Sequence, residues 1–195
     1  MSTGQALVVV AHPDDETIWM GGTILRHPAV RWTIFVLCRR DDSDRMPKFL
    51  KVAKRYGARG IISDLEDEGI MCVSESIPEI KRRLRREMRQ KKFDYIFTHG
   101  TNGEYGHPRH IGVHRAVQEF VDHGELSCGK FYLFSYATDD RRRIINREKG
   151  ASAFVKLGRG ELREKRRIVK EFYGFSTKSF ENVSCLPVEL FRKAK

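Results

Sequence analysis

Two short stretches of the sequence contain the side chains best suited to do chemistry. The first is "AHPDDE", Ala11 to Glu16, in which one histidine precedes three consecutive acids. Neighbouring carboxylates repel one another more strongly as a site loses water, so a buried cluster of this kind needs a cation or solvent to relieve the repulsion. A metal site would explain the pattern, and an exposed acidic turn is the simpler alternative.

The second stretch is "FTHGTNGEYGHPRHIGVHRAV", Phe97 to Val117, which passes from a strand-like run through a glycine-rich loop into a helical pattern. His107, His110 and His114 follow one another at spacings of three and four, which places them on related faces of a helix. More than one of these histidines could therefore face the same ligand.

Histidines and carboxylates with one position left open for water are typical of catalytic zinc, whereas four protein ligands are typical of structural zinc. His12 and Asp15 are three residues apart, so a helical turn would place them side by side. Either His110 or His114 could complete this set, and spacing does not choose between them.

The elements around these stretches predict an α/β fold. Strand-like runs occur at "ALVVVA", "VRWTIFVLC", "GARGIIS", "FDYIFTH" and "KFYLFSYA". Between and after them, helical patterns are expected at Thr17–Leu25, Met46–Tyr56, Ile77–Gln90, His110–His123 and Gly160–Phe172. This alternation favours one Rossmann-like, doubly wound domain over residues 1–195, with a mostly parallel sheet covered on both faces. Ligands of such sheets bind outside the carboxyl ends of the strands, where both chemical stretches should emerge.

The formal net charge of +11 directs attention to anionic partners. Nucleic acid, a membrane surface and a phosphorylated small substrate all fit such a charge. The helix expected at Ile77–Gln90 carries a basic face, and "DDRRRIINREKG" adds another cluster. Because no aromatic residues or known binding module accompany the basic face, a solvated helix surface is favoured over nucleic-acid binding, which stays open as an alternative.

The four cysteines lie far apart and form no C-x-x-C pair, so reduced thiols and a cytoplasmic location are expected. The apolar run Ala6 to Ala11 is too short for a signal peptide, and no stretch approaches the roughly 18 apolar residues of a transmembrane segment. The sequence leaves the oligomeric state open, a homo-oligomer included.

Together, "AHPDDE" and "GEYGHPRH", Gly103 to His110, resemble motifs of the zinc-dependent N-deacetylase family. This family includes the LmbE-like proteins, the glycosylphosphatidylinositol-pathway (PIG-L) N-acetylglucosaminyl deacetylases and the mycothiol-pathway deacetylases. The resemblance extends more weakly through "RMPKFLKVAKRYGA" and covers roughly Leu7 to Val117. It implies an LmbE-like fold, a Zn²⁺ cofactor and a small amino-sugar substrate of the N-acetylglucosamine type.

The resemblance also implies roles for single residues. It implies that His12, Asp15 and His110 hold the zinc and that Asp14 is the general base. His107 matches a histidine that stabilises the oxyanion or protonates the leaving amine, and Tyr105 matches a tyrosine that assists at the oxyanion in some members of the family.

Two arginines are implied near the substrate. Arg45 aligns with a family arginine that is usually followed three residues later by Glu, where this chain has Lys48. Arg109 replaces the Asp of the commoner "HPDH". Its charge should lower the pKa of His107, unless its side chain points outward to a substrate phosphate.

The expected function is therefore a zinc-dependent hydrolase that removes acetyl from an N-acetylated amino sugar by metal-activated water. The net charge makes an anionic substrate the favoured partner. One alternative is an amide hydrolase acting on a thiol or another non-sugar conjugate. Another is a basic protein that binds nucleic acid or acidic lipid on a retained metal-binding scaffold.

Overall fold

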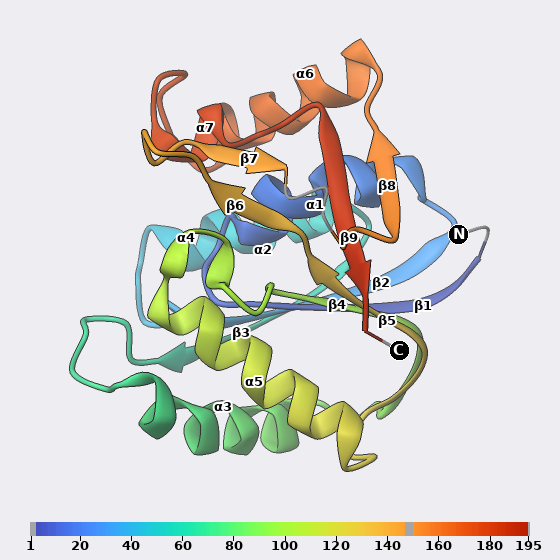
Figure 1. Cartoon of the computed structure of the whole chain (residues 1–195), viewed down its shortest axis with the longest axis vertical. Coiled ribbons are helices and arrows are strands. Elements are labelled where there is room, and N and C mark those ends of the chain that lie inside the picture. The colour runs from blue at the N-terminus through green and yellow to red at the C-terminus, as the bar shows by residue number, and fades with distance from the viewer. Residues whose placement is uncertain (1–2, 147–149, 195) are drawn as a thin grey trace.

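The computed structural model describes residues 3–146 and 150–194, which are built around one seven-stranded sheet (Figure 1). The strands lie in the order β3-β2-β1-β4-β5-β9-β8. Neighbours among the first five are parallel, and β9 and β8 are added antiparallel at one edge. The bounds are β1 Gly4–Val10, β2 Val30–Cys38, β3 Arg59–Leu65, β4 Lys92–Thr98, β5 Ser127–Phe134, β8 Ala153–Lys156 and β9 Val188–Lys193. The predicted α/β class with a mostly parallel sheet is confirmed.

Helices cover both faces of the sheet (Figure 1). One face packs against α1, α2 and the π-helix η1, with α6 beside α1, and the other packs against α3 and α5. Of two short helices, α4 contacts α5 and β6 (Tyr136–Thr138), and α7 contacts η1. The bounds are α1 Asp15–Arg26, α2 Arg45–Arg55, α3 Val73–Glu87, α4 Gly103–Gly106, α5 Pro108–Asp122, α6 Arg159–Arg167, η1 Ile168–Phe172 and α7 Phe180–Val183. Within the described residues, no helix combines the length and the hydrophobicity needed to cross a bilayer.

Strand alternation divides the core into two clusters. In β1, Ala6, Val8 and Val10 pack on the α1 side, whereas Leu7 and Val9 pack on the α3–α5 side. Successive strand residues point to opposite faces, so a strand covered on both sides must be apolar at every position. The uninterrupted run "ALVVVA" therefore places β1 in the interior of the sheet.

The helix expected at Ile77–Gln90 begins earlier than predicted, at Val73. The backbone N–H of Cys72 donates to the Glu75 carboxylate at 2.8 Å, which satisfies a donor at the helix start. The helix expected at Gly160–Phe172 is present as α6 followed by η1.

The run "KFYLFSYA" does not form one strand. Where β5 ends, Ser135 donates its backbone N–H to the carbonyl of Leu190 on β9, at 2.9 Å. The chain then leaves the sheet as β6 (Tyr136–Thr138), which pairs with β7 (Ile144–Asn146) in a separate two-stranded sheet. The basic cluster "DDRRRIINREKG" falls on this hairpin, and its residues 147–149 lie outside the described residues.

A buried ion pair joins three elements at an interruption of α1. Met20 has a non-helical φ of −150°, and the backbone N–H groups of Gly22 and Thr23 donate to the Glu189 carboxylate on β9, at 2.9 and 2.7 Å. On α6, Lys165 Nζ lies 2.7 Å from Glu189 Oε1, and both side chains are 0% exposed. The pair therefore ties α6 and β9 to the middle of α1.

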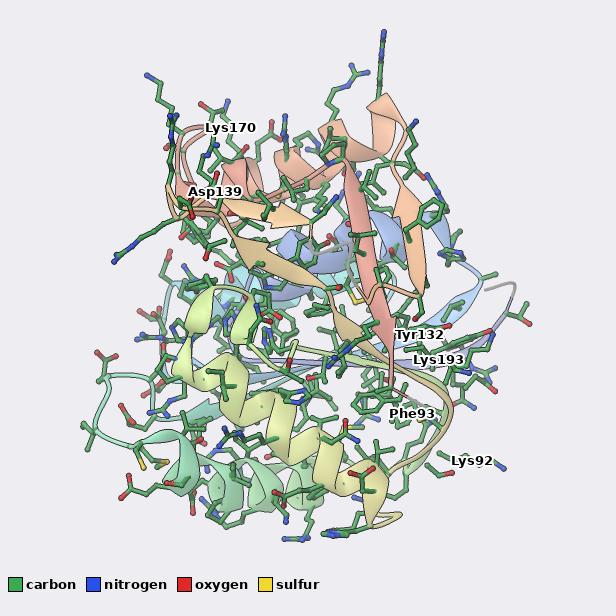
Figure 2. All side chains as sticks on the ribbon, in the orientation of Figure 1. Lys92, Phe93, Tyr132, Asp139, Lys170 and Lys193 are labelled. Carbon is green, nitrogen blue, oxygen red and sulfur yellow. The ribbon has the colours of Figure 1, made fainter. Side chains whose placement is uncertain are left out.

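Replacing Lys165 with methionine should destabilise the protein by about 3–5 kcal/mol, because the volume is kept while Glu189 becomes an uncompensated buried charge. The free energy of unfolding in urea measures the change. Lys170→Met is the matched control, because Lys170 is exposed in the adjoining η1 (Figure 2) and its loss should change stability by less than about 0.5 kcal/mol. Wild-type stability of the Lys165→Met variant would contradict the role given to the pair.

Candidate metal centre and active site

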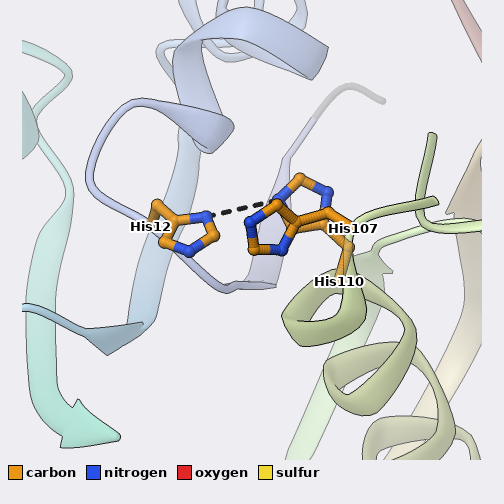
Figure 3. Close-up of side chains that lie close together, drawn as sticks. All are labelled: His12, His107 and His110. Carbon is orange, nitrogen blue, oxygen red and sulfur yellow. Dashed lines mark hydrogen bonds between the residues drawn. The ribbon is translucent and has the colours of Figure 1, made fainter. Parts of the chain in front are cut away.

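The two chemical stretches meet at the carboxyl ends of β1 and β4, which are neighbours in the sheet. His12 follows β1 closely, and His110 lies in the first turn of α5, after the loop that leaves β4. Figure 3 shows the rings of His12, His107 and His110 close together. The fold thus joins two segments that are about a hundred residues apart in the sequence.

Three potential ligand atoms, His12 Nδ1, Asp15 Oδ2 and His110 Nε2, form a nearly equilateral triangle. The two nitrogens are 3.3 Å apart, and Asp15 Oδ2 lies 3.3 Å from the His12 nitrogen and 3.4 Å from the His110 nitrogen. Tetrahedral zinc with bonds of about 2.0–2.1 Å requires ligand atoms roughly 3.3–3.4 Å apart. The three atoms therefore fit one face of a tetrahedral metal site.

Two other histidines nearby are engaged elsewhere. Nε2 of His99 accepts the backbone N–H of Ala11 at 3.0 Å. Nδ1 of His114 donates to the carbonyl of His99 at 3.1 Å. Of the two histidines that spacing left open, the structure thus places His110 beside His12 and Asp15.

The second ring nitrogen of each histidine in the triangle contacts a carboxylate. His12 Nε2 lies 3.0 Å from Asp67 Oδ1, and His110 Nδ1 lies 2.7 Å from Glu104 Oε2. Such contacts fix the tautomer and orientation of metal-binding histidines. Sequence reasoning missed both carboxylates, although Glu104 lies inside the "GEYGHPRH" motif and Asp67 follows β3, the next strand but one from β1.

The charges of this cluster favour a cation. Burial opposes ionisation, but contacts with His12 and Arg39 lower the pKa of Asp67 to about 2, and contacts with His99 and His110 lower the pKa of Glu104 to about 2. Burial also disfavours a charged imidazole, yet the bonds from His12 to Asp15 and Asp67 raise the pKa of His12 to about 10. A proton and a metal ion would therefore compete for His12.

Asp14 lines one pocket together with His12 and Asp15, but its carboxylate has different partners from that of Asp15. Its Oδ2 accepts a hydrogen bond from Arg45 Nη2 at 2.9 Å, and the residue is only 5% exposed. Burial and the charge of Asp15 raise the pKa of Asp14 well above its usual value, while Arg45 and His12 work in the opposite direction. A buried carboxylate with a raised pKa is suited to accept a proton.

Glu16 stabilises a strained backbone conformation at Asp14. Asp14 has a φ of 131°, a conformation that non-glycine residues rarely adopt, and its N–H donates to Glu16 Oε2 at 3.1 Å. Glu16 Oε1 accepts hydroxyl hydrogen bonds from Thr17 and Tyr173, at 2.6 and 2.7 Å. Tyr173 lies in the part of the chain where the sequence carried no recognised motif, so this support was not foreseen.

His107 caps the start of α5 and faces the pocket as a neutral ring. Its Nδ1 accepts the backbone N–H of Arg109 at 3.3 Å, which leaves the ring proton on Nε2. Burial and the charges of His110 and His12 lower the pKa of His107 to about 4. At neutral pH His107 is therefore an uncharged hydrogen-bond donor rather than a protonated acid.

Aromatic side chains form part of the pocket wall, which encloses about 310 Å³. The ring of Tyr105 lies 5.6 Å from that of His107 and 5.0 Å from that of Phe180. Burial and the charges of Asp15 and Asp14 raise the pKa of Tyr105, so its hydroxyl keeps its proton. Trp19 completes this wall, and its Nε1 donates to Asp15 Oδ1 at 2.8 Å.

Arg45 lines the pocket, and its contact with substrate stays a prediction. Its guanidinium also contacts the carbonyl of Pro13 at 2.9 Å and lies over the Phe175 ring. Lys48, which stands where the family usually has Glu, instead pairs with Asp44 at 2.6 Å.

Arg109 is not among the residues that line the pocket, so the structure does not support the prediction that it binds substrate. It is 2% exposed, and its guanidinium donates to the carbonyls of Glu66 and Met71, at 2.6 and 2.8 Å, and to the Glu66 carboxylate. The lowered pKa of His107 arises from burial and from His110 and His12. At the start of a helix, side chains two residues apart point in different directions. Here the Arg109 side chain forms its hydrogen bonds with the loop between β3 and α3.

A family model described as "PIG-L: GlcNAc-PI de-N-acetylase" matches residues 7–121, more than half of the chain. The chain belongs to this family. The resemblance noted in the two motifs is thus confirmed.

Two curated proteins similar to this PIG-L chain are 1D-myo-inositol 2-acetamido-2-deoxy-alpha-D-glucopyranoside deacetylases. That of Nocardia farcinica is 28% identical and matches over 62% of this chain and 52% of its own length. That of Mycolicibacterium gilvum is 25% identical over 68% and 59%.

The chain spans about half the length of the curated relatives it matches. Two solved structures share its fold. The 4-carboxy-2-hydroxymuconate hydratase of Pseudomonas putida has a TM-score of 0.68 and 14% identity, with 100% of this chain and 97% of that one covered. The A40926 pseudoaglycone deacetylase Dbv21 has a TM-score of 0.60 and 11% identity, with 86% and 81% covered. At these identities the likeness concerns the fold alone.

Replacing Glu104 with glutamine should weaken zinc binding by about 10- to 100-fold, because the carboxylate that orients His110 loses its charge. Competition with a chelator measures the affinity. Glu181→Gln is the control, since Glu181 lines the pocket and, within the described part of the chain, makes no hydrogen bond to the three ligand-type residues. Equal zinc affinity of the Glu104→Gln variant and wild type would contradict this role.

Proposed function

We propose that this PIG-L family chain is a zinc-dependent hydrolase that removes acetyl from an N-acetylated amino sugar. The observation that carries the proposal is the ligand triangle of His12, Asp15 and His110, with Asp14 in the same pocket. The curated relatives support the substrate class, because they are named as deacetylases of an acetamido sugar.

Each residue of the pocket has a part in this chemistry. Zinc held by the triangle would lower the pKa of a bound water and polarise the amide carbonyl. Asp14 takes the proton of the attacking water, and Arg45 helps to keep that carboxylate ionised beforehand. The same carboxyl group then returns the proton to the departing amine, because neutral His107 is a poor acid at this stage.

The oxyanion that develops on the substrate needs hydrogen-bond donors that do not themselves transfer a proton. His107 Nε2–H and the Tyr105 hydroxyl are uncharged at neutral pH and border the same pocket. Fixed donors of this kind stabilise charge that appears only in the transition state. Both side chains are therefore assigned to the oxyanion.

The ion pairs of α3 weigh against the nucleic-acid alternative. Three basic side chains of its exposed face contact carboxylates at 2.7 Å: Lys81 with Glu119, Arg82 with Glu79, and Arg85 with Glu125. A face whose cations are already paired offers less charge to a phosphate backbone. The basic helix is thus better explained as a solvated surface.

Hydrolysis of a non-sugar amide would use the same residues. A substrate screen distinguishes this alternative from deacetylation of an amino sugar.

We predict about one zinc per chain in protein purified without chelator, and little metal in a His12→Ala, Asp15→Ala or His110→Ala variant. Asp14→Asn should keep its metal but hydrolyse about 10²- to 10⁴-fold more slowly, because the proton acceptor is gone. Metal analysis is combined with acetate release from N-acetylglucosamine, its phosphates, nucleotide-linked forms and chitooligosaccharides. Loss of metal in Asp14→Asn would place Asp14 among the ligands, and no acetate from any sugar would reject the proposal.

Removing the charge of Arg45 should move the acid limb of kcat/KM to higher pH. Asp14 must be ionised to accept a proton, so activity falls as the pH drops through its pKa. Arg45 lowers that pKa, and the Arg45→Gln variant should therefore lose activity at a higher pH than wild type. Lys48→Gln is the control on the same helix, because Lys48 pairs with Asp44. An unshifted acid limb in Arg45→Gln would show that Asp14 does not set it.

A further inference from the structure

A second cavity adjoins the active-site pocket. It is lined by Tyr105, Thr138, Arg142 and Phe180, and it shares Tyr105 and Phe180 with the pocket. These two rings meet edge to face with centroids 5.0 Å apart, and each residue is 38% exposed. The cavity therefore begins where the aromatic wall of the pocket ends.

The β6–β7 turn presents Arg142 to this cavity. Asp139, labelled in Figure 2, accepts the backbone N–H groups of Arg141 and Arg143 at 3.0 and 2.9 Å, and its carboxylate also pairs with the Arg143 side chain. Arg142 donates its own N–H to the Asp139 carbonyl and has a left-handed φ of 58°. Arg143 thus closes the turn through Asp139, and Arg142 lines the cavity.

Arg142 has no carboxylate partner among the residues that the structure describes. Among the described residues, its guanidinium has no hydrogen bond or ion pair, and Asp139 is neutralised by Arg143. Glu181, the nearby acid of α7, lines the active-site pocket and is not among the residues that line this cavity. Non-glycine residues in left-handed conformations are enriched at ligand contacts, and a free guanidinium matches the geometry of phosphate.

We infer that this cavity binds the group attached to the amino sugar and that this group carries a phosphate, which Arg142 contacts. The inference rests on the proposed function, because it takes the sugar to lie at the ligand triangle. The Tyr105 ring lies 5.3 Å from the His110 ring, so a conjugate that starts at the triangle reaches the cavity by passing this one side chain. Arg142 is thus a specificity residue and takes no part in the hydrolysis itself.

The test compares two phosphate conjugates, N-acetylglucosamine 1-phosphate and nucleoside-diphosphate-linked N-acetylglucosamine, with neutral diacetylchitobiose. Binding is measured by calorimetry in an Asp14→Asn background. Arg142→Asn, which removes the charge and tolerates the left-handed backbone, should weaken binding of a phosphate conjugate by about five- to tenfold and leave chitobiose binding unchanged. Arg142→Lys should retain part of the affinity, and added salt should reduce the difference in affinity between the Arg142→Asn variant and its background.

Arg141→Ala is the matched control, because Arg141 lies on the same turn but does not line the cavity. It should bind both kinds of ligand as the background protein does. Equal affinity of both phosphate conjugates for the Arg142→Asn variant and its background would overturn the inference, and so would an equal loss of chitobiose binding, which indicates a structural role. Phosphate-dependent binding through Arg142 without acetate release by wild type would reject the proposed function and keep the anion site.

Discussion

The electrostatic repulsion among buried carboxylates is the constraint on which this site depends. Asp14, Asp15 and Glu16 are consecutive and at most 5% exposed, so each needs its own compensation. Asp15 lies against two imidazoles and Asp14 against the Arg45 guanidinium, whereas Glu16 accepts hydrogen bonds from neutral hydroxyls. These different partners separate the three acids into a candidate metal ligand, a candidate proton acceptor and a support for the backbone between them.

The compensating groups come from parts of the fold that lie far apart in the sequence. The family match ends at residue 121, yet Tyr173 beyond it holds Glu16, and Lys165 holds Glu189 against the interrupted α1. The C-terminal third of the chain therefore stabilises the candidate site, in addition to extending one edge of the sheet. A chain in which α6 and η1 packed differently would leave buried acids unpaired at the helix that carries Asp15.

The sequence predicted what depends on local pattern. Short apolar runs identified the parallel strands, and the two motifs identified the segments that meet at their carboxyl ends. It could not predict contacts made across the fold by single side chains in irregular segments, such as Asp67 with His12 or Tyr173 with Glu16. The strand "KFYLFSYA" was predicted too long for a related reason, because the β9 partner that takes the N–H of Ser135 had no recognisable signal.

Arg109 illustrates how such a contact changes the meaning of a sequence difference. Judged by charge alone, the change from "HPDH" to "HPRH" concerns the protonation of His107. In the structure, Arg109 forms an ion pair with Glu66, and His107 is neutral because it is buried beside two other imidazoles. Glu66 directly precedes Asp67, whose carboxylate contacts His12. By binding Glu66, Arg109 therefore ties the loop that carries Asp67 to the helix that carries His110. The arginine thus links the supports of two histidines of the triangle, a mechanical role that a charge argument along the sequence does not reveal.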